Sequence, residues 1–242
     1  MSEPGSRRGR VHDAEGAREA ILNAAEEVFA QHGFDGARID DIAKTSDYNK
    51  SLLFHYFDSK LGLYAEVVKR ADRETSMLQM QELRPFLEED ESLLSDPYRF
   101  RTFLEAIVRV TFDYLVEHPR LLRIFLWEQA EGWQTYMKIA SQLNNEDMVL
   151  AERLFGQARK AGWLRSDVDP IILFVMAVQF CMSYLSSIPL YQVVLPDRDF
   201  SSSAAMARIR EQIVEFVVHG IMADPPADKA IDNGSDQVTH KR

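Results

Sequence analysis

Apolar residues near the amino terminus recur every three or four positions, which is the period of one helix face. They are Ala17, Ala20, Ile21, Ala24, Ala25, Val28 and Phe29. This stripe predicts a scaffold helix from about Ala14 to His32, and Gly33 is placed to end it as a C-cap. Residues 1–13 are polar, basic and glycine-bearing, so we expect a flexible arm that is either unstructured or reaches DNA.

Two short helical patterns follow, over about 39–45 and 50–57, and a polar turn at 46–49 separates them. Leu53 and Phe57, four positions apart, are the expected buried residues of the second helix. Other side chains there lie off that stripe: Asn49, Lys50, Ser51, His55 and Tyr56. A short helix that presents polar and aromatic groups beside a packed partner helix suits insertion into a DNA major groove.

Longer helical patterns fill the rest of the chain, with no strand alternation of useful length. We expect helices after Ser59 and over about 98–117, 119–129, 131–161, 171–188 and 204–222. The pattern over 131–161 leaves a break near Asn144 and Asn145 open. Residues 82–97, with their acidic run, are interpreted as a solvated loop or helix end, and residues 224–242 as a disordered tail.

The segment from Ile171 to Ile188 contains no charged residue, and Asp169-Pro170 is a strong helix start ahead of it. Its length approaches that of a membrane span. It has no basic flank, stands alone and contains the polar residues Gln179, Ser183, Ser186 and Ser187. A helix that is apolar on most sides is otherwise buried on most sides. We therefore expect a partner subunit to cover it, and no membrane.

Composition fits a soluble globular protein, with 46% hydrophobic and 27% charged residues among 242. Residues 1–70 carry 10 Lys and Arg against 12 Asp and Glu, whereas 71–242 carry 18 against 26. The net charge of −10 excludes a protein coated in basic residues, so DNA binding has to rest on a local basic face. Cys181 alone cannot form an intrachain disulfide, and the amino terminus lacks the apolar core of a signal peptide. We expect a cytoplasmic location.

Motifs of common enzymes are missing from the sequence. We find no phosphate-binding glycine loop, no nucleophile elbow and no zinc-ligand pair, and the six histidines are scattered. We therefore expect no catalytic residues, no metal and no cofactor.

The segment from Gly33 to Lys60 resembles the DNA-binding domain of the TetR family of transcriptional regulators. The matching residues are Gly33-Phe34, Ile39-Asp40-Asp41-Ile42-Ala43, Asn49-Lys50, Leu53-Phe54-His55-Tyr56-Phe57 and Ser59-Lys60. The likeness extends over about residues 14–70; beyond it the chain is similar to the family only as an all-helical domain with two long last helices.

This resemblance implies which side chains contact DNA. Asn49 and Lys50 start the helix whose beginning reaches base edges. Phe54, His55 and Tyr56 would meet the sugar-phosphate backbone or a thymine methyl group, and Phe54 could equally pack within the motif. The full expected set is Arg38, Lys44, Asn49, Lys50, Ser51, Leu52, Phe54, His55, Tyr56 and Lys60. Lys60 is expected on a phosphate.

Three residues depart from the family pattern. Arg38 replaces a frequent threonine and brings a charge suited to phosphate. Asp47 stands where the turn usually has glycine, and Asp tolerates the left-handed backbone at some energetic cost. Leu52 replaces another threonine, so a hydroxyl contact is lost and a thymine methyl contact becomes possible. These changes bear on operator preference rather than on the motif.

The larger domain is rich in aromatic residues, which serve as core more often than as pocket. The resemblance implies a small ligand between its helices, and the candidate pocket residues are Phe103, Asp113, Trp127, Glu128, Glu131, Tyr136 and Phe180. The last two long helices are expected to form a four-helix dimer interface through Phe174, Val178, Met182, Ile209, Ile213, Phe216 and Val217.

The sequence thus predicts an all-α homodimer. A basic arm (1–13) precedes a three-helix DNA-binding domain (14–75), an effector-binding and dimerisation domain (76–223) and a tail (224–242). The predicted function is a ligand-responsive regulator, in the first place a repressor, that binds a palindromic operator. A dimeric protein-interaction module and an all-helical enzyme stay open as alternatives.

Overall fold

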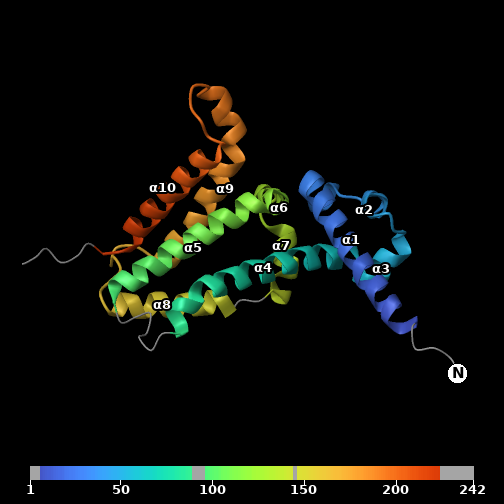
Figure 1. Ribbon diagram of the computed structural model, residues 1–242, viewed down its shortest axis with the longest axis horizontal. Helices are drawn as coiled ribbons and strands as arrows, with labels where there is room; N and C mark the ends of the chain where they lie inside the picture. The colour runs from blue at the N-terminus through green and yellow to red at the C-terminus, as the bar shows by residue number, and fades with distance from the viewer. Residues whose placement is uncertain (1–5, 89–95, 144–145, 224–242) are drawn as a thin grey trace, which may run out of the picture.

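The computed structural model describes residues 6–88, 96–143 and 146–223, and within these ranges the chain is helical with a single isolated β-bridge, between Leu164 and Met222. The helices are α1 (Ser6–Gly36), α2 (Ile39–Ser46), α3 (Lys50–Phe57), α4 (Lys60–Glu88), α5 (Pro97–Glu117), α6 (Pro119–Ala130), α7 (Gln134–Ile139), the 3-10 turn η1 (Ala140–Gln142), α8 (Glu146–Lys160), α9 (Pro170–Val194) and α10 (Ser203–Ile221). Helices α1 to α3 gather at one end of the molecule, and α4 leads from them along α5 (Figure 1). The all-α prediction is confirmed.

The predicted positions of the amino-terminal helices are largely confirmed. Gly33 has φ of +67° and interrupts α1 where a C-cap was expected, after which the chain makes one more turn to Gly36. Ser59 caps α4, because its hydroxyl accepts a hydrogen bond from the Gly62 N–H at 3.0 Å. At its start α1 differs from the prediction: helix begins at Ser6, so much of the expected arm is helical, and residues 1–5 lie outside the described residues.

Longer elements depart further from the sequence pattern. Helix α4 continues to Glu88, across the predicted boundary at residue 75, and residues 89–95 and 224–242 lie outside the described residues. The pattern over 131–161 is divided among α7, η1 and α8. Helix α9 passes through Pro189, where the sequence predicted its end, and continues to Val194.

Ring contacts hold the last turns of α9 in place beyond Pro189, a residue that removes one backbone donor from the helix. Tyr191 lies 6.0 Å from Tyr184 and 5.5 Å from Phe200, measured between ring centroids. The Tyr184 hydroxyl also donates to the Phe200 carbonyl at 3.0 Å. These contacts tie the last turns of α9 to the loop that leads into α10, and this end of the hairpin projects from the body (Figure 1).

The cores of the two predicted domains meet at α6 and α7. The amino-terminal core of α1 to α4 also contains Ile124 of α6 and Ile139 of α7, both fully buried. A second core joins α5, α8, α9 and α10 around Phe100, Leu104 and Val218. The DNA-binding unit is therefore not a free module, because two residues of the larger domain complete its core.

Candidate DNA-binding surface and ligand sites

The turn between α2 and α3 has the geometry that its polar sequence predicts. Asp47 adopts φ of 60° and ψ of 19°, a left-handed conformation, and so takes up the strain that a glycine would avoid. Asn49 then caps α3, since its Oδ1 accepts a hydrogen bond from the Leu52 N–H at 2.9 Å. This capping oxygen of Asn49 faces its own helix, which leaves the amide nitrogen as the group that can approach DNA.

Helix α3 has a buried side and an open side. Leu53 and Phe57 are buried at 2% and 4% exposure, whereas Phe54 on the same helix is 44% exposed. Phe54 is therefore an outward-facing residue rather than packing within the motif. Among the other expected DNA contacts, the exposed ones are Arg38, Lys44, Asn49, Lys50, Ser51 and His55, and the half-buried ones are Leu52, Tyr56 and Lys60.

Lys50 is held by an ion pair across the helix-turn-helix. Its Nζ lies 2.5 Å from Oδ1 of Asp40 in α2, and both side chains are more than half exposed. Exposed ion pairs of this kind contribute about 0–1 kcal/mol to stability. Lys50 can therefore leave Asp40 and contact a base or a phosphate at little cost in free energy. The pair orients Lys50 before DNA arrives, and it lowers the positive charge of this face in the free protein.

Lys60 has a different environment from the one the sequence implied. Its Nζ donates to the Asp35 carbonyl at 3.3 Å and lies 4.6 Å from the centroid of the Phe34 ring. Desolvation lowers the pKa of the Lys60 ammonium, against an opposing pull from Asp35. Lys60 thus joins the start of α4 to the end of α1, and a phosphate contact would have to share or replace these interactions.

Gly62 is a residue that sequence reasoning missed. An added Cβ at Gly62 would lie 2.1 Å from the backbone carbonyl oxygen of Phe57, the last residue of α3. The absence of a side chain lets the first turn of α4 pack directly against the end of α3. The signal in the sequence was a glycine three residues after the helix cap Ser59, in the first turn of a helix, where glycine is otherwise unfavourable.

The candidate pocket residues do not surround one cavity. Phe103 belongs to the buried core, and Phe180 is exposed on α9. Asp113 is paired with Arg210 of α10, with 2.6 Å between Oδ2 and Nη1. The other four lie where α6 and α7 meet the DNA-binding unit: Trp127, Glu128, Glu131 and Tyr136. Aromatic and acidic character marked these positions in the sequence, but it could not show which of them lie in the core, which where the two domains meet and which on the surface.

A buried carboxylate lies at the joint, meaning the region where α6 and α7 meet the DNA-binding unit. Glu128 is 2% exposed; its Oε1 accepts from the Tyr64 hydroxyl of α4 at 2.6 Å, and its Oε2 accepts from the Tyr136 N–H at 3.0 Å. Burial, and then the hydrogen bond to Glu128, raise the pKa of Tyr64, so the phenol stays protonated and donates. The bond between Tyr64 and Glu128 is one of the contacts that link the DNA-binding unit to the larger domain.

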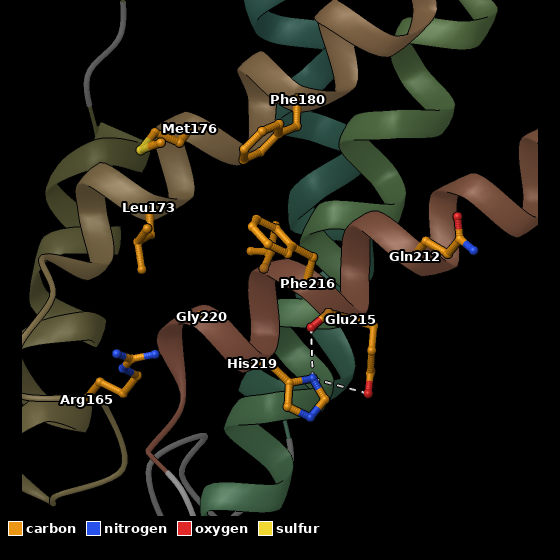
Figure 2. Close-up of a pocket in the computed structure, with 10 residues that line it drawn as sticks. Arg165, Leu173, Met176, Phe180, Gln212, Glu215, Phe216, His219 and Gly220 are labelled. Carbon is orange, nitrogen blue, oxygen red and sulfur yellow. Dashed lines mark hydrogen bonds and ion pairs between the residues drawn. The ribbon is translucent and has the colours of Figure 1, made fainter.

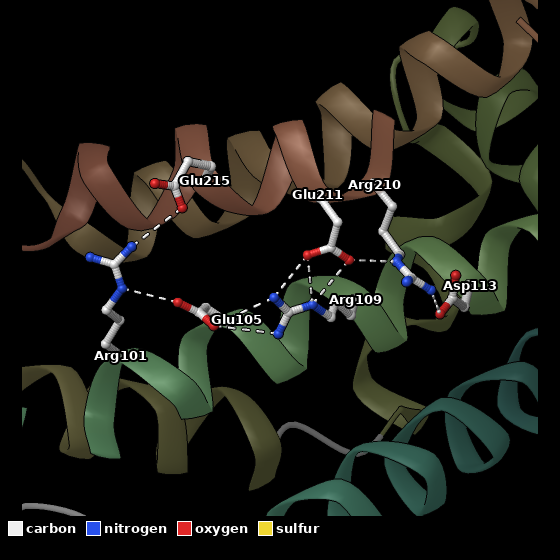
Figure 3. A network of polar contacts seen from close by, with 7 residues as sticks. All are labelled: Arg101, Glu105, Arg109, Asp113, Arg210, Glu211 and Glu215. Atoms are coloured by element: carbon white, nitrogen blue, oxygen red, sulfur yellow. Dashed lines mark hydrogen bonds and ion pairs between the residues drawn. The ribbon is translucent and has the colours of Figure 1, made fainter. Parts of the chain in front are cut away.

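Helices α5 and α10 are joined by a row of ion pairs (Figure 3). Arg109 contacts Glu211 across the helices at 2.8 Å, and Arg210 contacts Asp113 at 2.6 Å. Arg101 and Glu105 extend the row along α5. The hydrogen bond from Arg109 lowers the pKa of Glu211. Asp113 is therefore engaged in helix packing.

The outer face of α9 and α10 is apolar and open. Its exposed residues are Ile172, Val175, Met176, Phe180 and Phe216. Phe180 and Phe216 make an edge-to-face contact, and beside them lies a groove of about 580 Å³ that Leu173 and His219 also line (Figure 2). Of the described helices, α9 is the one long and apolar enough to cross a membrane, with mean hydropathy of 2.0.

The residues expected at the dimer interface lie mostly on the other side of these helices. Met182 and Val217 are buried within the protomer, at 3% and 5% exposure, and are not accessible to a partner. Half-buried against the same cores are Phe174, Val178, Ile209 and Ile213. Phe216, at 65% exposure, is the member of the set that faces outward. The uncharged run from Ile171 to Ile188 has no polar stripe that would show which face of α9 is buried and which is open.

Within the described ranges, no group of three or more His, Cys, Asp or Glu side chains is arranged to hold a metal ion. Cys181 is buried, and burial raises the pKa of its thiol to about 12. It behaves as a small hydrophobic residue of the core.

Comparison with known proteins places both parts of the chain. A family model described as bacterial regulatory proteins, tetR family, matches residues 21–67, and a second, described as tetracyclin repressor-like C-terminal domain, matches residues 101–217. HTH-type transcriptional repressor SCO4008 of Streptomyces coelicolor is 34% identical over 121 residues, about half of each protein: 50% of this chain and 54% of that one. HTH-type transcriptional regulator RutR of Escherichia coli is 26% identical over 84% of this chain and 90% of its own.

Solved structures share the architecture. The crystal structure of SCO4942 from Streptomyces coelicolor aligns over 85% of this chain and 98% of that one, with a TM-score of 0.56 and 26% identity. A TetR-family transcriptional regulator of Haemophilus influenzae Rd, HI0893, aligns over 86% and 97%, with a TM-score of 0.57 and 19% identity. The latter similarity is one of fold.

Proposed function

Because this chain belongs to the TetR family of bacterial transcriptional regulators, we propose that it is a cytoplasmic, ligand-responsive repressor that binds a near-palindromic operator as a homodimer. The observation that carries the DNA-binding part is helix α3. Its buried residues fix it against α1, α2 and α4, while Lys50, Ser51, Phe54 and His55 remain exposed on a helix of the length that enters a major groove.

Base reading would be concentrated at the start of α3. Lys50, released from Asp40, would donate to base edges or a phosphate, and the Asn49 amide would act beside it. Phe54, His55 and Tyr56 would contact sugar-phosphate or a thymine methyl group. Arg38 and Lys44 on α2 would contact phosphates, which fix the register without reading sequence.

A second copy of the chain is the proposed cover of the α9 and α10 face. Exposed aliphatic and aromatic residues continue along this face from Ile172 to Phe180 and onto Phe216. A contiguous apolar surface of this kind is rare on a monomer and typical of an interface. Two-fold symmetry would then place two α3 helices on successive major grooves, which is why the operator should be near-palindromic.

The proposed switch is a linkage between ligand and DNA. An effector that binds better to one arrangement of the two α3 helices shifts the equilibrium toward that arrangement. DNA must weaken effector binding by the same factor as the effector weakens DNA binding, typically about 5–150-fold. The joint at α6 is the route by which the larger domain can reposition the DNA-binding unit, since Glu128 and Ile124 contact it directly.

Selection of bound sequences from a random DNA pool tests the proposal. Enrichment of a near-palindrome with half-site centres about 34–36 Å apart, or a multiple, is expected. The affinity should fall steeply with salt, because phosphate contacts release counterions. If no sequence is enriched and no salt-dependent binding occurs, a protein-interaction module becomes the better account.

A further inference from the structure

A groove between α6 and α9 lies beside the DNA-binding unit. It measures about 470 Å³, within the range of small-molecule sites, and its lining residues are Pro119, Leu122, Arg123, Leu126, Trp127, Leu185, Ser186 and Pro189. Its walls are aliphatic, with one indole. Arg123 is the charged residue among them, and the hydroxyl of Ser186 lies on the opposite, α9 side.

We propose that this groove is an effector site for an amphipathic carboxylate, meaning an apolar chain or ring that ends in one carboxylate. The inference rests on the proposed regulatory function and specifies its ligand class. Leu122, Leu126 and Leu185 match an apolar body, and the planar Arg123 guanidinium matches a carboxylate, which it can bind through two parallel hydrogen bonds. A neutral or cationic head group would leave that charge unused or repel it.

Two residues that line the groove, Arg123 and Trp127, also contact the end of α1. Arg123 Nε donates to the Ala30 carbonyl at 3.1 Å, and Trp127 Nε1 donates to the same oxygen at 3.3 Å. Ala30 is 2% exposed and lies three residues before the kink at Gly33. Two side chains of α6 thus hold one backbone carbonyl near the end of the scaffold helix of the DNA-binding unit.

The Trp127 ring adds a packing contact at the kink. A Cβ on Gly33 would lie 3.2 Å from Trp127 Cδ2, so the indole lies directly on the backbone of Gly33. Gly33 is followed within a few residues by α2, the first helix of the DNA-binding motif. Movement of Arg123 or Trp127 is therefore transmitted to the backbone that leads into that motif.

Competition for Arg123 couples the two sites. The bond to Ala30 uses one of five N–H donors of the guanidinium, and a carboxylate in the groove would draw the group toward the groove. A shift of the guanidinium would weaken its bond to Ala30 and leave Trp127 as the remaining donor, which loosens the end of α1 against α6. The described residues that line the larger groove between α9 and α10 include none from α6, and a second copy of the chain would cover that groove.

Calorimetric titration of the full chain with octanoate, octan-1-ol and octylamine tests the proposal, with Arg123→Ala, Arg123→Lys and Arg120→Ala as variants. Arg120 is the matched control, because it also pairs with α1, at 2.8 Å from Glu27, but does not line the groove. We expect saturable octanoate binding, octanol and octylamine binding at least about tenfold weaker, and a loss of about tenfold or more in Arg123→Ala. Arg123→Lys should be intermediate and Arg120→Ala unchanged.

Repeating the titration with the protein saturated by its selected operator tests the link to α1. Octanoate should bind more weakly to the complex, by the factor by which it weakens the operator. Absence of octanoate binding, equal binding of octanol, or an unaltered Arg123→Ala affinity in a protein with a normal melting curve would overturn the site. Equal octanoate affinity with and without operator would overturn the coupling. Selection of an operator needs no ligand, so either failure leaves the DNA-binding proposal standing.

Discussion

The DNA-binding unit and the helix pair α9 and α10 differ in how well their sequences show which helix face is buried. In α3, the spacing of Leu53 and Phe57 marks the buried side and polar residues mark the open side, which Phe54 shares although it is apolar. In α9, apolar residues lie on every side, and Met182 is buried while Met176 is 45% exposed. This difference shows that a stripe of polar residues, more than the apolar content, tells which face of a helix is buried in the core and which is open to a partner.

Buried and exposed positions of the helix pair should respond very differently to a charge. Met182→Glu places a carboxylate inside the protomer, which costs several kcal/mol, and should unfold the larger domain. Phe216→Glu, on the open face, should give a folded monomer. Sedimentation and thermal melts of both variants check this. A folded monomeric Met182→Glu, or an unchanged dimer for Phe216→Glu, would reverse our assignment of the two faces.

Two phenylalanines of α3 provide the same comparison in the DNA-binding unit. Phe57→Ala should lower the free energy of unfolding by about 3–5 kcal/mol, because it empties a core position. Phe54→Ala should change stability little and weaken operator binding. Denaturant unfolding and operator titration are the measurements. A large loss of stability in Phe54→Ala would mean that this ring packs within the motif.

The joint between the domains should be sensitive to a single hydroxyl. Tyr64→Phe leaves Glu128 Oε1 buried without its donor, and should lower the free energy of unfolding by about 1–3 kcal/mol. Tyr184→Phe is the control, since its partner carbonyl at Phe200 lies at the half-exposed projecting end. Equal effects of the two changes on denaturant unfolding would show that the joint is no more tightly held than the periphery.

The ion pairs between α5 and α10 should have the smallest effect. Arg109 lowers the folded-state pKa of Glu211, so the stabilisation is complete above the usual carboxyl range and is lost as pH falls through the lowered value. Glu211 is 46% exposed, and the contribution should therefore stay below about 1 kcal/mol. Glu211→Gln should remove this part of the acid dependence of unfolding. An unaltered acid limb in the variant would contradict the assignment.

Much of the fold was predictable because local chemistry is explicit. Gly33 marks the kink in α1, one turn before its end, and Asp169 and Ser202 cap the helices that they precede. The polar turn gave α2 and α3 almost to the residue. The path of α9 beyond Pro189 was not predictable, because contacts among Tyr184, Tyr191 and Phe200 decide it, and these depend on the loop that follows.

Less of the site could be predicted, for a related reason. The types of side chain on α3 can be read from the sequence, but their partners cannot. The pairing of Lys50 with Asp40 and the contacts of Lys60 with Asp35 and Phe34 were therefore not predictable. Aromatic content cannot say whether a ring such as Trp127 lines a cavity or packs on a backbone. Arg123, which does both by contacting Ala30 and lining a groove, carried no signal in the sequence at all.

The most direct test of the central claim, that α3 reads the operator through its exposed first turn, is to select operators in parallel with the wild-type chain and Lys50→Ala. The wild type should enrich a near-palindrome. Lys50→Ala should keep the half-site spacing but lose preference at one position in each half-site, with affinity reduced by about 1–3 kcal/mol. If the two proteins enrich the same motif with the same affinity, α3 does not read DNA as described.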